Sequence, residues 1–578
     1  MRCKRMLEVL VILFLGISVF ISSAGATEYT YVGPDNGNWS TSENWSPEPV
    51  WSPEMPDGYP AGASNSAWIN AVSSNVNVNL DYSISLNGLK VDAGDSLTFS
   101  HIFSLSGTDP YVVNNGAINV NNNGYFNIEP DVTATFSGTG VLNLVNGGSL
   151  KGEGTYINAS GHTIQGVGTI GADMDNRGDI IADGGGLHFH GHDVIQSPTG
   201  TLTTTGPGSL LTMGNDLKLF GGSLNPNGGE VRLDNMSVFD GTNFGPGNIV
   251  VGDYGPSGVY LMGNFTTAAD FTITQGATLS LSGLDDDPWI TNTGEILVES
   301  NGVTQLRAIY GKTAIFTGTG SIVLGGTDSR LSQEGDGAFA NDENHTIRGS
   351  GTIDAPVYNI GTIIAENGTL VINQPIKRVP EEAGDYGPGR IEVKSGGTLD
   401  VKANVETGDL IMEPEALLFV QNTRIIDLKG DFIFEQTNEA YWDWGPGSVL
   451  RMSGGGDLQR LEVGGNGSAA YPFTNNFNLP ELSILGAGTQ VYLTDLIDNG
   501  NRNSPEALYL DILYIEAGAT LFLNDIDLYT LAGLVEPGIW ANGGGLVVDA
   551  AVPLPGSVLL LGSGLLGLGL LGWRRKKG

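Results

Sequence analysis

Half of the six histidines lie in one short segment, Leu187-His188-Phe189-His190-Gly191-His192. If this segment is a strand, His188, His190 and His192 point to one face, because side chains alternate along a strand. Three imidazoles on one face match the ligands of a Zn²⁺ or Cu²⁺ site. A solvated strip of histidines without a metal role is the competing interpretation.

Three consecutive carboxylates, Asp285, Asp286 and Asp287, stand before a Pro-Trp pair. Carboxylate oxygens are ligands that Ca²⁺ takes, so this segment is a second candidate metal site, with a solvated turn as the alternative. No other cofactor is expected. The sequence contains no Gly-x-Ser-x-Gly elbow and no P-loop, and Arg177, Arg232, Arg307 and Arg348 stand in no recognisable motif. We therefore predict no catalytic residues and a protein that is not an enzyme.

The composition limits the folds that could position these residues. The chain has 578 residues, with 87 glycines, 26 Lys and Arg, 63 Asp and Glu, and a net charge of −37. Such a high glycine content disfavours long helices, and the negative charge excludes a nucleic-acid binder held by phosphate contacts. The single cysteine, Cys3, lies at the very N-terminus, so disulfides are not expected. The composition favours an acidic, turn-rich, all-β protein.

One short pattern recurs along the chain: a glycine, a small polar residue, and then apolar residues alternating with polar ones. Eight examples begin at Gly94, Gly116, Gly168, Gly178, Gly200, Gly351, Gly361 and Gly397. The alternation predicts half-buried strands, and we expect each glycine to supply the positive φ of a tight turn. Many successive turns fall 20 to 22 residues apart, which is the length of one β-solenoid coil.

A longer block of about 180 residues is duplicated. The segment Phe136-Ser137-Gly138-Thr139-Gly140 recurs as Phe316-Thr317-Gly318-Thr319-Gly320, and His162-Thr163-Ile164 recurs as His345-Thr346-Ile347. Stacked repeats bury the apolar faces of their neighbours, so the duplication predicts an elongated parallel β-solenoid, specifically a right-handed β-helix. An array of β-sandwiches is the alternative.

Residues 27–75 have a different character, because Trp39, Trp45 and Trp51 fall six residues apart among several prolines. We interpret this segment as a cap on the first coil, whose free edge would otherwise pair with other chains. An exposed aromatic platform for sugars is the alternative.

The N-terminus has the features of a secretory signal peptide. Arg2, Lys4 and Arg5 precede an apolar run, and Ala24-Gly25-Ala26 gives a small-x-small cleavage pattern. We therefore expect export and removal of residues 1–26.

The C-terminus predicts a membrane segment. Val552-Pro553-Leu554-Pro555 is followed by 18 uncharged residues, 556–573, and then by Arg574-Arg575-Lys576-Lys577. Eighteen such residues just cross a bilayer core, and the basic cluster stays on the cytoplasmic side. The predicted organisation is, in chain order, a signal peptide (1–26), a Trp- and Pro-rich cap (27–75), a solenoid (76–548) with duplicated blocks near 104–225 and 280–465, and a transmembrane sorting tail (549–578).

This tail resembles the PEP-CTERM sorting signal of Gram-negative bacteria, in a Val-Pro-Leu-Pro variant with Leu554 in place of the family's Glu. The resemblance implies a sorting signal made of Val552, Pro553, Leu554, Pro555, Arg574 and Arg575. It also implies processing by an exosortase-like membrane protease-transpeptidase after transient anchoring in the inner membrane. Family members are associated with exopolysaccharide and biofilm, and the repeats are similar to those of bacterial adhesins.

These observations predict a secreted structural or adhesive protein of the bacterial cell surface or exopolysaccharide matrix. Its expected partners are the exosortase-like protease and exopolysaccharide or surface glycans. Nucleic acid is not an expected partner, and the membrane is contacted only through the tail before processing. The competing class is a secreted β-helix polysaccharide lyase or glycoside hydrolase.

Overall fold

The fold is described from a computed structural model, whose described residues divide between two compact units, 1–231 and 232–578. The described residues are 26–548, except for 50–59, 71–74, 215, 240, 253–257, 284–285, 301–302, 310, 379–388, 457, 468–475, 498, 500–505, 536–538 and 541–545. The signal peptide up to Gly25 and the sorting tail 549–578 lie outside this range. No helix within it is long and apolar enough to span a membrane.

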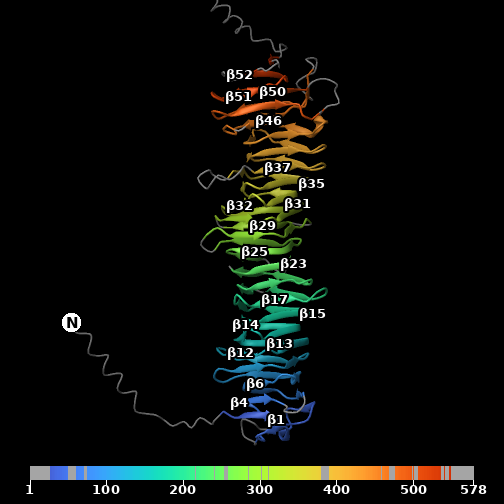
Figure 1. Cartoon of the computed structure of the whole chain (residues 1–578), viewed down its shortest axis with the longest axis vertical. Coiled ribbons are helices and arrows are strands. Elements are labelled where there is room, and N and C mark those ends of the chain that lie inside the picture. Colours follow the sequence, from blue (N-terminus) through green and yellow to red (C-terminus); the bar gives the residue numbers. More distant parts are fainter. Residues whose placement is uncertain are drawn as a thin grey trace, which may run out of the picture. The chain divides into compact units, whose positions relative to one another are not determined.

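Unit 1 is a parallel β-solenoid, drawn in blue to cyan in Figure 1. One coil consists of β10 (Ala117–Val120), β11 (Tyr125–Ile128) and β12 (Thr133–Ser137). The long strand β13 (Val141–Asn158) pairs with all three, each time in parallel. The stack continues through β14 (Thr163–Asn176), β15 (Asp179–His190), β16 (Asp193–Gln196), β17 (Thr201–Thr204) and β18 (Leu210–Gly214).

Unit 2 has the same construction in its own residues, drawn from green to red in Figure 1. The strand β25 (Phe265–Ile273) pairs in parallel with β27 (Trp289–Asn292) and β28 (Glu295–Val298). Further strands of this unit are β23 (Asn243–Val251), β30 (Thr313–Thr317), β31 (Ser321–Glu334), β33 (Thr346–Ile353), β35 (Thr362–Ile372), β46 (Leu458–Glu462), β47 (Gly465–Asn466), β49 (Gln490–Thr494) and β50 (Glu506–Ile515). The prediction of an all-β parallel solenoid is therefore confirmed for each unit.

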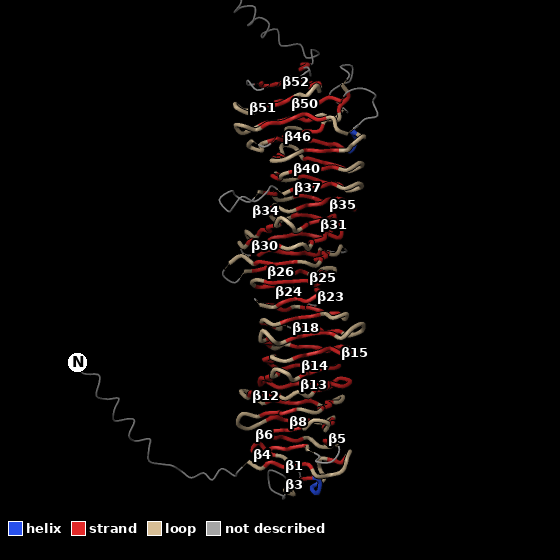
Figure 2. The backbone as a smooth tube through the Cα atoms, viewed as in Figure 1, coloured by secondary structure: helices blue, strands red, loops and turns tan. Residues whose placement is uncertain are grey.

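Almost all regular structure in the described ranges is strand, as Figure 2 shows; two 3-10 turns there are η1 (Ser42–Asn44) and η3 (Glu439–Tyr441). Buried and half-buried residues alternate along the strands, for instance in β7 (Ser96–Phe99), where Leu97 and Phe99 are buried. The predicted coil spacing holds in part. Paired residues lie 21 positions apart between Ser96 and Ala117, 16 between Thr163 and Asp179, and 32 between Leu458 and Gln490.

The recurrent glycines serve close packing more often than turns. Of the eight, only Gly94 (φ 90°) and Gly351 (φ 153°) have the positive φ that we expected. At the other six a Cβ atom would lie 2.1 to 2.4 Å from a backbone carbonyl oxygen, for example that of Gly148 at Gly168. The expectation of positive φ is wrong at these six positions. Glycine is needed there because a neighbouring stretch of backbone leaves no room for a side chain.

The duplicated block encloses a buried polar ladder in unit 1. His162 is fully buried, with Nδ1 2.7 Å from Asn158 Oδ1. Asn158 Nδ2 donates to Asn176 Oδ1 over 2.8 Å, and Asn176 Nδ2 donates to Gln196 Oε1 over 3.1 Å. Such a chain of amides satisfies polar groups that have no access to water.

The second copy of the block repeats this arrangement within unit 2. His345 Nδ1 lies 2.7 Å from Asn341 Oδ1, and Asn341 Nδ2 donates to Asn359 Oδ1 over 2.8 Å. Burial lowers the pKa of His162 and of His345 to about 4. The histidines that recur in the sequence are therefore core residues that hold an amide ladder.

The tryptophans of the N-terminal segment are also core residues. Trp39 and Trp45 are almost completely buried, and their ring centroids are 4.5 Å apart. Trp45 packs edge-on against Tyr31, and its Nε1 donates to the carbonyl oxygen of Trp39 over 2.9 Å. Neither ring can serve as an exposed platform for sugars. Trp51 lies outside the described residues.

Candidate functional sites

The histidine segment lies at the end of β15. His188 and His190 share the outer face of this strand, as predicted, with ring centroids 6.3 Å apart and nearly parallel rings. Burial, and then the charge of His190, lower the pKa of His188.

His192 departs from the strand geometry that we expected. The strand ends at His190, Gly191 has φ 63°, and His192 Nδ1 lies 3.3 Å from Asp173 Oδ1. In the described chain, these three histidines do not bring three ligand atoms within 4.8 Å of one another. A metal site at His188, His190 and His192 stays a prediction.

The aspartate segment lies beside an open cleft of unit 2. Asp285 is outside the described residues, whereas Asp286 and Asp287 line a cleft of about 610 Å³. Asp287 Oδ1 accepts a hydrogen bond from the Thr313 N–H over 2.9 Å. These two side chains join no group of three close metal-ligand atoms within the described ranges. Calcium binding at this segment stays a prediction.

Trp289 is an exposed aromatic residue of this cleft, which we call the Trp289 cleft. The other lining residues are Gly241, Asn243, Asn264, Phe265, Thr266, Asp286, Asp287 and Thr291. The Trp289 side chain is 48% exposed, although the strand that it begins buries Ile290 almost completely. The alternation of β27 therefore places a large aromatic ring at the surface.

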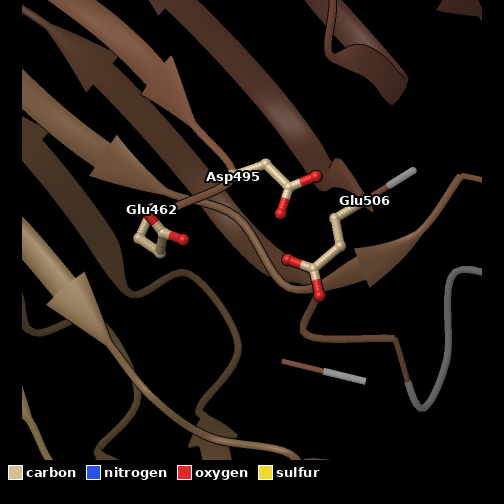
Figure 3. Close-up of side chains that lie close together, drawn as sticks. All are labelled: Glu462, Asp495 and Glu506. Carbon is tan, nitrogen blue, oxygen red and sulfur yellow. The ribbon is translucent and has the colours of Figure 1, made fainter. Parts of the chain in front are cut away.

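One group of three carboxylates does come together in the described ranges: Glu462, Asp495 and Glu506 (Figure 3). An oxygen of each lies within 4.8 Å of the others. Glu462 ends β46 and pairs with Thr494 of β49, while Glu506 begins β50. Sequence analysis missed this group, because three coil segments bring together residues that are far apart in the chain.

Two of these carboxylates are buried and hold the backbone after β49. Glu462 accepts hydrogen bonds from Thr494 Oγ1 and from the N–H groups of Leu496 and Ile497, at 2.6 to 2.9 Å. Glu506 Oε1 accepts from the Asn499 N–H over 2.8 Å. Burial raises the pKa of Glu462, and the hydrogen bonds from Thr494, Ile497 and Leu496 partly offset that rise.

Three carboxylates at this distance have the oxygen chemistry that hard divalent cations take. The contacts of Glu462 already explain why a carboxylate is buried here, since its oxygens satisfy the donors of residues 494–497. We therefore interpret the group as an anchor for this loop. Comparison of the chain with protein-family models, with curated proteins and with solved structures gives no match.

Proposed function

We propose that this protein is an exported structural or adhesive component of the bacterial cell surface or exopolysaccharide matrix. In this proposal the chain is a right-handed β-helix capped by residues 27–75. The tail 549–578 forms a membrane helix until an exosortase-like transpeptidase removes it. The protein is then secreted or displayed at the surface of a Gram-negative bacterium.

The observation that best supports this function is a ladder of polar side chains on the outside of unit 1. Asn143 Nδ2 donates to Asn119 Oδ1, and Gln165 Nε2 donates to Asn143 Oδ1, each over 2.9 Å. Asn119 Nδ2 in turn donates to Thr98 Oγ1. The ladder crosses four successive coils whose residues pair in register.

Such a ladder places an amide on three successive coils and a hydroxyl on the coil before them. Regular spacing allows a polymer to make many weak contacts, whose joint affinity exceeds that of any single contact. Glycans and hydrated divalent cations are the partners that suit amides, hydroxyls and a net charge of −37.

The intact mass of the exported protein tests the sorting part of the proposal. We expect a mature chain that starts near Thr27 and ends near Pro555. A matched variant with Arg574→Gln and Arg575→Gln should keep its tail and stay in the inner membrane. A secreted wild-type chain that extends to Gly578 would overturn the role of the tail.

The competing function is a β-helix polysaccharide lyase or glycoside hydrolase. Incubation of the purified protein with acidic polysaccharides, with and without added Ca²⁺, separates the two classes by viscosity. A scaffold does not cleave the polysaccharide, so the viscosity does not fall with time. A steady fall in viscosity, accompanied by new reducing ends, would replace the structural proposal with the enzymatic one.

A further inference from the structure

We infer that the Trp289 cleft of unit 2 is a binding site for a neutral glycan. The inference depends on the proposed matrix function for its biological setting, and it adds a defined site and a chemical class of ligand. The cleft lies on β23, β25 and β27, in the part of Figure 1 drawn in green.

The backbone of Trp289 is anchored beside this cleft. Its backbone N–H donates to Asn264 Oδ1 over 2.9 Å, which fixes the start of β27 against the preceding coil. Ile290 and Asn292, which point inward, are buried. The neighbouring side chains anchor the strand. A ligand that binds here therefore has to order only the exposed ring, which costs little conformational entropy.

A row of small polar side chains lines the cleft. Asn243, Thr266 and Thr291 occupy paired positions on β23, β25 and β27. Thr317 Oγ1, on the next coil, donates to Thr291 Oγ1 over 3.3 Å. This row therefore offers amide and hydroxyl groups in line with the paired strands.

Asp286 and Asp287 also line the cleft. A Cβ atom on Gly283 would lie 1.5 Å from the Asp286 carbonyl oxygen, so a side chain at position 283 would displace Asp286. The Thr313 N–H bonds to Asp287 Oδ1 and holds that carboxylate in place. These two residues bring carboxylate oxygens, which accept hydrogen bonds, to the cleft.

This combination suits a sugar. The face of an aromatic ring is electron-rich and attracts the weakly positive C–H groups on one face of a pyranose. Sugar hydroxyls donate to carboxylates and exchange hydrogen bonds with amides and threonine hydroxyls. The volume of about 610 Å³ lies in the range of small-molecule sites.

The negative charge of the cleft favours neutral glycans over anionic ones. The described residues that line it include two aspartates and no Lys or Arg, so an anionic polysaccharide would be repelled at close range. The net charge of −37 adds repulsion at longer range. A neutral glycan keeps the stacking and the hydroxyl contacts without this penalty.

Isothermal titration calorimetry of the full mature chain tests the inference. The probes are the neutral hexasaccharides of cellulose, laminarin, mannan and chitin, with oligogalacturonate as the anionic comparison. We expect at least one neutral probe to bind and oligogalacturonate to bind more weakly or not at all. Trp289→Ala should weaken that binding about tenfold or more, as for a central aromatic contact.

Two controls keep the result interpretable. Tyr514→Ala removes another exposed aromatic residue, one that does not line the cleft, and should leave affinity unchanged. Circular dichroism and thermal unfolding should show that Trp289→Ala is folded. The inference is overturned if no neutral probe binds at millimolar concentration, if oligogalacturonate binds best, or if Trp289→Ala binds as tightly as the wild type.

The outcome is independent of the sorting experiment. Correct export and processing without Trp289-dependent binding would refute the glycan site and leave the proposed function unaffected. Trp289-dependent binding by a chain that is never processed would support the glycan site and refute the sorting part of the proposed function.

Discussion

The Nδ1 atom of His345 donates a hydrogen bond to Asn341 Oδ1 over 2.7 Å. The direction follows from the neighbours, because Asn341 Nδ2 already donates to Asn359 Oδ1. At the other ring nitrogen, Asn292 presents its Nδ2 at 3.2 Å, while its Oδ1 accepts from the Gly294 N–H. Both contacts require a neutral imidazole with its hydrogen on Nδ1.

Acidification should therefore destabilise the fold through this residue. Burial lowers the pKa of His345 to about 4, whereas an unfolded histidine titrates near 6.5. Because the unfolded chain takes up the proton first, the contribution to stability is complete above about pH 6.5. It falls as the pH drops toward 4, by up to about 3 kcal/mol. Urea unfolding at several pH values, followed by circular dichroism, measures this slope.

His345→Asn should lower stability at pH 7 and reduce the slope between pH 6.5 and 4. His162→Asn should do the same for the matching ladder in unit 1. His101→Asn, at an exposed position outside both ladders, is the control for removal of a histidine. An NMR titration that placed the His345 imidazole near pH 6.5 would contradict the buried, neutral ring.

Asn176→Ala tests the buried amide ladder. The change leaves the Nδ2 of Asn158 without its Asn176 acceptor and the Oε1 of Gln196 without its Asn176 donor, and all three residues are buried. Each such loss costs about 1–3 kcal/mol. We expect faster hydrogen exchange in β14 to β17 and a lower midpoint of urea unfolding.

The outer ladder provides a matched control, Asn143→Ala. Asn143 also bonds to two side chains, but it is only half-buried, so water can replace those bonds. Its loss should cost about 0.5 kcal/mol or less. Equal effects at Asn176 and Asn143 would argue against a special role for the buried ladder.

The strands could be predicted from the sequence because alternation is a local property. The pattern after Gly116 predicts a strand, and β10 occupies Ala117–Val120 with Ile118 and Val120 buried. The duplication around His162 and His345 likewise predicted coils that stack on their neighbours. What the pattern does not contain is the reason for each glycine, which depends on how closely another stretch of backbone passes.

The sites were harder to predict, because they depend on which coils lie next to each other. Coil length differs from one place to another, so the distance in sequence between stacked residues is not constant. Glu462 and Glu506 therefore meet without any motif that joins them. The sequence shows Trp289 close to three aspartates. It does not predict that Trp289 is exposed, because this depends on the register of β27.

Gly168→Ala tests close approach between coils. The new Cβ would lie 2.1 Å from the Gly148 carbonyl oxygen, and backbone atoms cannot yield as a flexible side chain can. We expect a loss of about 1–3 kcal/mol, as for other overpacked positions. Gly171→Ala, three residues along the same strand, meets nothing nearer than 3.9 Å and should be tolerated. Thermal unfolding of both variants measures the difference, and equal midpoints would contradict close packing as the reason for Gly168.

Trp45→Ala tests the role of the N-terminal tryptophans as a cap. Removal of this buried ring takes away contacts with Trp39 and Tyr31, and comparable truncations cost about 3–5 kcal/mol. The loss should be local, because each coil of a solenoid contacts mainly its neighbours. We expect rapid hydrogen exchange in β1 (Glu28–Tyr31) and β4 (Gly62–Ile69), with β13 and β14 still protected.

Substitution of Trp289 by Ala, compared with Trp45→Ala, separates a tryptophan that contacts the ligand from one that packs in the core. The Trp289 ring is 48% exposed, so Trp289→Ala should cost little stability while it weakens glycan binding. Trp45→Ala should do the opposite and should also promote self-association, since loosening the first coil frees strand edges. Sedimentation velocity measures the self-association. A Trp45→Ala chain that stays monomeric and fully protected would show that the first coil needs no cap.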